Sequence, residues 1–274
     1  MGHGRAGSYP SATLQLFDPA LYGGILAIVL FVAILACLAA GRWLGQHVQG
    51  RAGSPSPTIG SLETAVFGLL GLLIAFTFSG ALSRFDLRRA QAVDEANAIG
   101  SAYLRIDILP AAAQAKLRDA MRAYVDARIA TYKKLPDVAA ARGEIVRSQA
   151  LQGEIWRQAV EATKLPQAKI GSDLLFLPAI NAMFDMSVVR LTATRIHPPS
   201  IIYIMLIALA VASAMLAGYQ SAADRDYDWI HKIGFATIIA LTVYVILEIE
   251  YPRLGLVRID AIDQLLVDAR AAMK

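Results

Sequence analysis

Three long stretches of this chain contain no charged residue and no histidine. They cover residues 21–41, 64–82 and 200–223 and are 21, 19 and 24 residues long. Because the hydrocarbon core of a bilayer is roughly 30 Å thick, about 20 apolar residues in a helix are needed to cross it. Each stretch meets that requirement, and together they exclude an ordinary soluble enzyme, a disordered chain and a disulfide scaffold.

A fourth apolar stretch, residues 233–247, is weaker. Its 15 residues rise only about 22 Å as a helix, so Lys232 and Glu248 would have to reach toward the headgroups from its two ends. With this stretch included, the sequence predicts an all-α integral membrane protein. It would have four transmembrane helices and a helical cytoplasmic domain between the second and the third.

The positions of Lys and Arg predict the orientation. The segment between the second and third spans carries 17 of the 26 Lys and Arg residues, and such an excess is typical of the cytoplasmic side. We therefore expect a multi-pass protein of the plasma (inner) membrane with both termini in the cytoplasm. The expected parts are a cytoplasmic N-terminus at 1–20, transmembrane helices 1 and 2 within 21–82, a helical cytoplasmic domain at 83–199, transmembrane helices 3 and 4 within 200–249, and a cytoplasmic C-terminal tail at 250–274.

Prolines divide the predicted cytoplasmic domain into helices. None occurs between Leu62 and Pro110, so the second span is expected to continue as one helix of 48 residues, about 72 Å long. Further helices are expected between Pro110, Pro136 and Pro166 and beyond, because proline interrupts a helix. Their predicted ranges are 111–134, 137–164 and 172–196.

No sequence motif of a catalytic or cofactor site is present: HExxH, CxxC, GxSxG and the glycine-rich phosphate loop are all missing. Asp224, Asp226 and Asp228 alternate as in a calcium loop, but Trp229 replaces the required glycine, which favours a solvated acidic loop. Cys37 is the only cysteine and cannot form a disulfide within the chain. We expect no enzyme activity, no metal or other cofactor and no nucleic-acid partner.

The second apolar stretch carries two stripes of side chains. Four large residues lie within about 40° of one another on a helical wheel: Phe67, Ile74, Phe78 and Phe85. Small residues form the adjacent stripe: Gly71, Ala75 and Ser79. In a ring of identical helices the small side can pack closely, and the large side would narrow a central lumen that gates by dewetting. The alternative is that both stripes pack against the other spans.

Charged residues follow this stretch. Arg84 and Arg88 share a helix face with Glu95, and in a ring the two arginines would form a positive vestibule that concentrates anions. The alternative is that they only orient the protein and form salt bridges along the helix. Near the end of the fourth span, Glu248 and Glu250 require partners at the membrane edge.

Arg253, or an arginine from the extension of the second span, could supply that partner. The sequence therefore suggests an interfacial acid and base cluster of Glu95, Glu248, Glu250 and Arg253. These carboxylates could pass protons along a relay, which is the more specific interpretation, or could simply form ion pairs.

Five stretches resemble a known family. They are residues 67–89, EANAIGSAYLR at 95–105, LP at 109–110, HPP at 197–199 and EYPRLGL at 250–256. Together they span almost the whole chain in order. They resemble the bestrophin-like domain family of bacterial and plant membrane proteins, a distant relation of the bestrophin anion channels.

True bestrophins are pentameric anion channels with four spans per subunit and a neck of large apolar residues on the second span. The resemblance implies that Ile74, Phe78 and, one turn later, Leu82 form the neck, with Phe67 on the same stripe. It further implies a homo-oligomer, a pentamer as in true bestrophins, that lies in the lipid bilayer and conducts inorganic anions such as chloride. The calcium clasp of animal bestrophins is missing, so calcium gating is not expected.

Two other functional classes stay open. A proton-driven stator of the flagellar-motor type also has four spans and a large cytoplasmic segment between the second and third. It needs a membrane partner with an essential acid and polar residues in its spans, for which Thr237 and Thr242 offer some support. A non-conducting scaffold or sensor would instead bind a partner through its helical cytoplasmic part.

Overall fold

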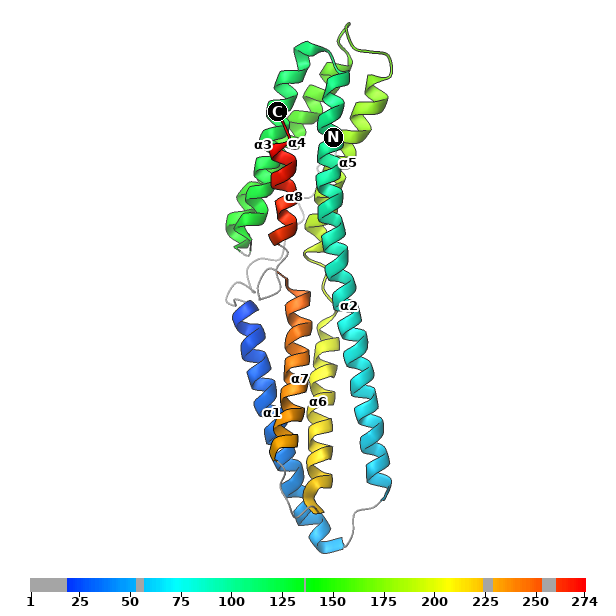
Figure 1. Ribbon diagram of the computed structural model, residues 1–274, viewed down its shortest axis with the longest axis vertical. Helices are drawn as coiled ribbons and strands as arrows, with labels where there is room; N and C mark the ends of the chain where they lie inside the picture. The colour runs from blue at the N-terminus through cyan, green and yellow to red at the C-terminus, as the bar shows by residue number, and fades with distance from the viewer. Residues whose placement is uncertain (1–18, 53–56, 136, 224–228, 253–259) are drawn as a thin grey trace, which may run out of the picture. The chain divides into compact units, whose positions relative to one another are not determined.

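The computed structural model describes residues 19–52, 57–135, 137–223, 229–252 and 260–274, and all regular structure within these ranges is helical. In chain order the helices are α1 (Pro19–Ala52), α2 (Pro57–Leu104), α3 (Ala111–Lys134), α4 (Val138–Thr163), α5 (Ser172–Ala193), α6 (Ser200–Gln220), α7 (Trp229–Glu250) and α8 (Asp260–Ala271) (Figure 1). Short 3-10 turns follow α2 at Arg105–Ile108 and α6 at Ser221–Ala223. The predicted all-α class is confirmed.

Five of the described helices are long and apolar enough to cross a membrane: α1, α2, α5, α6 and α7. Helices α1, α2 and α7 contain three of the four apolar stretches of the sequence, and α6 covers residues 200–220 of the stretch 200–223. The fifth, α5, is a cytoplasmic helix in the sequence-based prediction, yet its length and composition also suit a span. The chain is thus built as a multi-pass membrane protein.

Helix α2 is one continuous helix of 48 residues, as predicted, although it begins at Pro57 and ends at Leu104. Proline is tolerated in the first turn of a helix, where its missing N–H has no partner in any case. Helix α3 has both predicted bounds, and α4 begins after Asp137, whose side chain accepts a hydrogen bond from the Ala140 amide at 3.0 Å. Helix α5 ends at Ala193, three residues before its predicted end.

The chain divides into two compact units. The first contains Met1–Gly71 and Leu206–Gly255, and in it α1 packs against both α7 and α6. A Cβ atom added to Gly218 on α6 would lie only 2.1 Å from the backbone oxygen of Leu38, and Gly41 on α1 is approached as closely by α6. These glycines let the two helix backbones touch, as small residues do in membranes.

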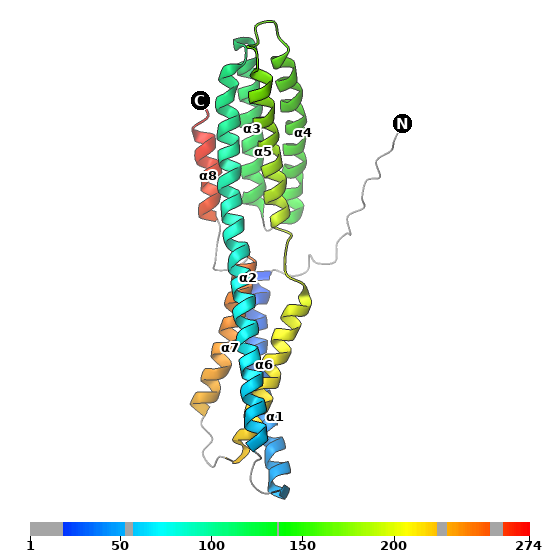
Figure 2. The ribbon, with the colours of Figure 1, turned by 90° about the vertical axis from the view of Figure 1, so that its right-hand side faces the viewer.

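The second unit contains Leu72–Met205 and Leu256–Lys274. In it the later part of α2 packs with α3, α4, α5 and α8 (Figures 1 and 2). The core includes Ile99, Tyr103, Met121, Tyr124, Ile155, Phe176, Ile180, Met183 and Leu266. Buried positions on α2 recur every three or four residues, at Ala92, Glu95, Ile99 and Ala102. That spacing defines one helix face, so α2 turns a single side, with Glu95 on it, toward this core.

Candidate functional site

Glu95 is a fully buried carboxylate in the core of the second unit. Its Oε1 atom lies 2.7 Å from Nε of Arg128 on α3, and its Oε2 atom lies 2.7 Å from Nη1 of Arg190 on α5. Both arginines are buried as well, with 2% and 4% of their surface exposed. One carboxylate thus joins three helices.

Tyr132 and Asp263 extend this arrangement. The Tyr132 hydroxyl accepts a hydrogen bond from Nη2 of Arg128 at 2.6 Å, and the Tyr132 ring centroid lies 3.8 Å from the guanidinium carbon of Arg190. Arg190 also forms an ion pair with Asp263 of α8. We call Glu95, Arg128, Tyr132, Arg190 and Asp263 the buried charge cluster.

The charges of this cluster balance, because two guanidinium groups meet two carboxylates. Burial acts to lower the pKa of Arg128, but the oxygens of Tyr132 and Glu95 favour its charged form and hold the pKa above its ordinary value. A buried ion is tolerated when it is paired and hydrogen-bonded. The cluster therefore fixes α2, α3, α5 and α8 against one another.

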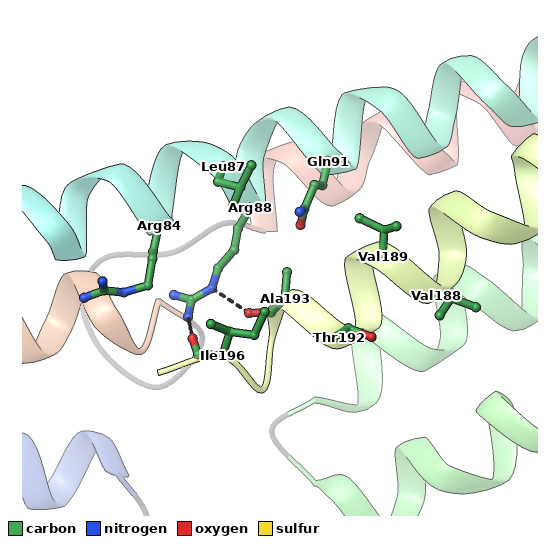
Figure 3. A pocket seen from close by; sticks show the side chains of 9 residues that line it. All are labelled: Arg84, Leu87, Arg88, Gln91, Val188, Val189, Thr192, Ala193 and Ile196. Atoms are coloured by element: carbon green, nitrogen blue, oxygen red, sulfur yellow. Dashed lines mark hydrogen bonds between the residues drawn. The ribbon is translucent and has the colours of Figure 1, made fainter. Parts of the chain in front are cut away.

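A groove lies between α2 and α5 in the same unit (Figure 3). Its volume is about 270 Å³. We call it the α2–α5 groove. Its α2 wall is formed by Arg84, Leu87, Arg88 and Gln91, and its other wall by Val188, Val189, Thr192, Ala193 and Ile196. Most of this lining is aliphatic, and two arginines contribute from α2.

Arg88 caps the end of α5. Its Nε donates to the Ala193 carbonyl at 3.2 Å and its Nη2 to the Ile196 carbonyl at 3.1 Å, as the dashed lines in Figure 3 show. Arg88 is only 8% exposed. The last carbonyls of a helix attract a cation, so this residue, predicted for the vestibule, has a structural function in the second unit.

Arg84 lies one turn earlier on α2 and is half-buried. A Cβ atom added to Gly80 would lie 3.3 Å from Nη1 of Arg84. The guanidinium therefore extends back along α2 over Gly80, toward the apolar stretch 64–82. In Figure 3 the Arg84 side chain points away from Val188 and Val189, at the opposite end of the groove.

The four residues predicted for a pore neck all lie on α2. Phe67, Ile74 and Phe78 are half-buried, and Leu82 is 41% exposed. The Phe67 ring meets Phe235 of α7 edge-on, with 5.5 Å between the ring centroids. Phe67 thus packs against a helix of its own chain.

The predicted acid and base cluster is distributed over both units. Glu95 belongs to the second unit, where Arg128 and Arg190 bind its carboxylate. Glu248 and Glu250 are buried on α7 of the first unit. Arg253 and the aspartates at 224, 226 and 228 lie outside the described residues. Within the described part of the chain, no three His, Cys, Asp or Glu side chains are placed to hold a metal ion.

Sequence reasoning identified Glu95 but missed its partners Arg128, Arg190 and Asp263. The sequence of α3 does indicate that Arg128 is buried, because Arg128 lies on the same helix face as the buried residues Met121 and Tyr124. A charged residue on the apolar face of an amphipathic helix indicates a buried ion pair, since an unpaired charge there is very costly. Arg190 in the apolar helix α5 carries the same signal.

The comparisons with known proteins give one family. The sequence model of the Bestrophin-like domain matches residues 27–262. No curated protein and no solved structure matches the chain. The matched range includes Glu95, Arg128, Tyr132 and Arg190, whereas Asp263 lies one residue beyond it.

Proposed function

The chain belongs to the Bestrophin-like domain family, and on this premise we propose that it forms an oligomeric ion channel that conducts anions. Like the bestrophin channels that the sequence resembles, it would place several copies of one membrane helix around a central pathway. The most suitable helix for that position is α2.

The observation that carries this proposal is the uncovered face of α2. Leu69, Leu72 and Phe76 are 51%, 52% and 68% exposed, and a Cβ atom added to Gly71 would meet no atom within 4 Å. A membrane helix with an apolar face and a glycine that its own chain leaves uncovered is suited to pack against further copies. Repetition of such a contact around an axis produces a lumen.

The proposed neck consists of Ile74, Phe78 and Leu82, with Phe67 at its outer end. Ile74, Phe78 and Leu82 retain exposed surface in a single chain, which leaves them free to face a lumen in an oligomer. A narrow ring of such side chains would hold water out when closed and would conduct when widened. Phe67 contributes least, because its ring packs on Phe235.

Arg84 and Arg88 would make the approach to this neck positive, because they follow the apolar stretch of α2. Positive charge at the mouth of a pore raises the local concentration of anions and speeds their entry. Arg84 is the stronger candidate, since it lies one turn nearer the neck and its guanidinium extends back over Gly80.

We propose four spans, formed by α1, the apolar part of α2, α6 and α7. Helix α5 packs against α4, and α4 exposes Arg142, Arg147, Arg157 and Glu161. Placing α5 in lipid would bring these charges into the bilayer, which is strongly unfavourable. The segment 83–199 and both termini would then lie in the cytoplasm, where the excess of Lys and Arg is expected.

Single-channel recording from the purified full-length protein in a planar bilayer tests conduction, and native mass spectrometry gives the subunit number. We expect an oligomer whose current reverses near the chloride equilibrium potential in a salt gradient. A monomer, or an oligomer that carries no current at any voltage, would contradict the proposal. A silent oligomer that co-purifies with a single-span partner would point to the stator class.

A further inference from the structure

The α2–α5 groove exposes large aliphatic side chains. Leu87, Val188, Val189 and Ile196 are 54%, 60%, 39% and 57% exposed, and all four line the groove. A cluster of exposed apolar side chains often marks a binding surface. This lining fits an aliphatic chain and offers few hydrogen-bond partners to a polar metabolite.

Positive charge is fixed at one end of the groove. Arg88 is held in place by the Ala193 and Ile196 carbonyls, and Arg84 extends from the next turn over Gly80 (Figure 3). A guanidinium group can pair with a carboxylate or phosphate through two parallel N–H donors. The complementary ligand therefore has an anionic head and an aliphatic tail.

The position of the groove favours a ligand that collects at membranes. Its α2 wall starts at Arg84, two residues after the apolar stretch 64–82, and its other wall ends at Ile196, four residues before the stretch 200–223. Both walls lead directly into segments that are suited to cross a bilayer. An amphiphile at the surface of that bilayer can enter the groove from there.

The size of the groove limits the ligand to a single short chain. Its volume of about 270 Å³ is just below the roughly 300–1,000 Å³ of pockets for drug-sized ligands, which leaves no room for the two chains of a phospholipid. The backbone rises about 10 Å from Arg84 to Gln91. Gln91 has a buried side-chain oxygen without a hydrogen-bond partner among the described residues, so the apolar surface ends there.

We propose that the α2–α5 groove binds a single-chain anionic amphiphile of fatty-acid type. Its carboxylate pairs with Arg84 beside Arg88, and its tail lies along Leu87, Val189 and Ile196 as far as Gln91. This binding site does not depend on the proposed function, because the groove lies within one chain and requires no ion conduction. Bound ligand would bridge α2 and α5 at the edge of the membrane.

Photolabelling of the full-length protein in nanodiscs of neutral lipid tests the site. The probe is decanoic acid with a diazirine on its chain, and mass spectrometry maps the labelled residues. We expect saturable labelling within 84–91 and 188–196 that unlabelled decanoate prevents and methyl decanoate does not. Arg84→Gln should raise the half-saturating concentration about tenfold or more, because a hydrogen-bonded charge pair is lost.

Arg89→Gln is the matched control. Arg89 lies on the same helix with 55% of its side chain exposed and an ion pair to Asp86 at 3.6 Å, so its loss should leave labelling unchanged. Val189→Trp should block labelling while Arg84 is retained, because it fills the groove at a half-exposed position.

Several results would overturn the proposal. They are labelling confined to α1, α6 and α7, equal competition by the methyl ester, and equal effects of Arg84→Gln and Arg89→Gln. Loss of labelling when an anionic phospholipid is added to the nanodisc would identify a bilayer lipid as the occupant and would also overturn it. Absence of labelling in an intact oligomer would likewise overturn it.

Discussion

The Nε atom of Arg128 lies 2.7 Å from Oε1 of Glu95, and the two side chains are 2% and 0% exposed. The residues are 33 positions apart in the chain, so this pair joins α2 to α3 across the core of the second unit. The pair therefore fixes the position of the helix that we propose to line the pore.

The first prediction follows from that burial. Glu95→Ala should lower the free energy of unfolding by about 3–5 kcal/mol, because it leaves the buried Arg128 without its carboxylate and Arg190 with Asp263 alone. Thermal unfolding of the detergent-solubilised protein measures the change. Arg147→Gln serves as the control, since the Arg147 side chain is 58% exposed and its partner Glu144 keeps a second ion pair with Lys134, and ion pairs of exposed side chains contribute about 0–1 kcal/mol. Equal melting temperatures for the two variants would contradict the structural function of the cluster.

The positions of the helices could be predicted because residues close to each end, prolines above all, determine where a helix begins and ends. Pro110 and Pro136 bracket α3, and the long interval without proline predicted one continuous α2, although both observed bounds of α2 lie five residues earlier. The partners of Glu95 were not predictable in the same way, because a helical wheel shows which face Glu95 occupies but not which helix meets that face. Arg128 and Arg190 come from α3 and α5, and only the packing of the second unit brings them together.

The glycines also show that a sequence can indicate a contact face of a helix without indicating its partner. Sequence reasoning singled out the small stripe with Gly71 on α2, yet space around Gly71 is open in the single chain. The close backbone contact occurs instead at Gly41 and Gly218, between α1 and α6. Small residues indicate that a helix can be approached closely, but the partner depends on the arrangement of all the spans.

The second prediction tests this contact. Gly218→Ala would place a Cβ atom 2.1 Å from the Leu38 carbonyl oxygen, a distance that forces α1 and α6 apart. We expect a marked loss of folded protein by size-exclusion chromatography after solubilisation. Gly234→Ala on α7 is the control, because no atom lies within 4 Å of the added Cβ. Equal yields from both variants would show that α1 and α6 do not pack through Gly218.

The third prediction concerns topology. In a Cys37→Ser background, cysteine placed at Ser56 or Ser221 should react with an impermeant thiol reagent added to intact cells. Cysteine at Gln149, which is exposed on α4, should react only after the membrane is opened. The reverse result would contradict the orientation, and labelling at all three positions in sealed cells would contradict four spans.

The fourth prediction separates the two vestibule arginines. Arg84→Glu should shift the reversal potential in a salt gradient toward cation selectivity, because the sign of charge at the pore entrance controls which ions concentrate there. Arg88→Glu should mainly reduce the amount of folded protein, since it removes two hydrogen bonds to the end of α5 and sets a carboxylate against carbonyl oxygens. An unchanged reversal potential for Arg84→Glu, with Arg89→Glu as the charge-matched control, would show that Arg84 does not face the ion pathway.

The last prediction concerns Ile74 and Phe78, for which two arrangements give opposite results in one experiment. Both side chains are half-buried in a single chain, so each could face a shared lumen or fill a contact between helices. If they line the neck, changing both to Ala should widen and wet the constriction, and conductance or open probability should rise while the oligomer survives.

If they pack between helices, the same change removes buried volume at a cost of about 2–5 kcal/mol for each side chain, by analogy with soluble cores. The double variant would then lose its oligomer and gain no current. Recording current and subunit number on the same preparation distinguishes these outcomes. We expect more current from an intact oligomer, because both side chains retain exposed surface in the single chain.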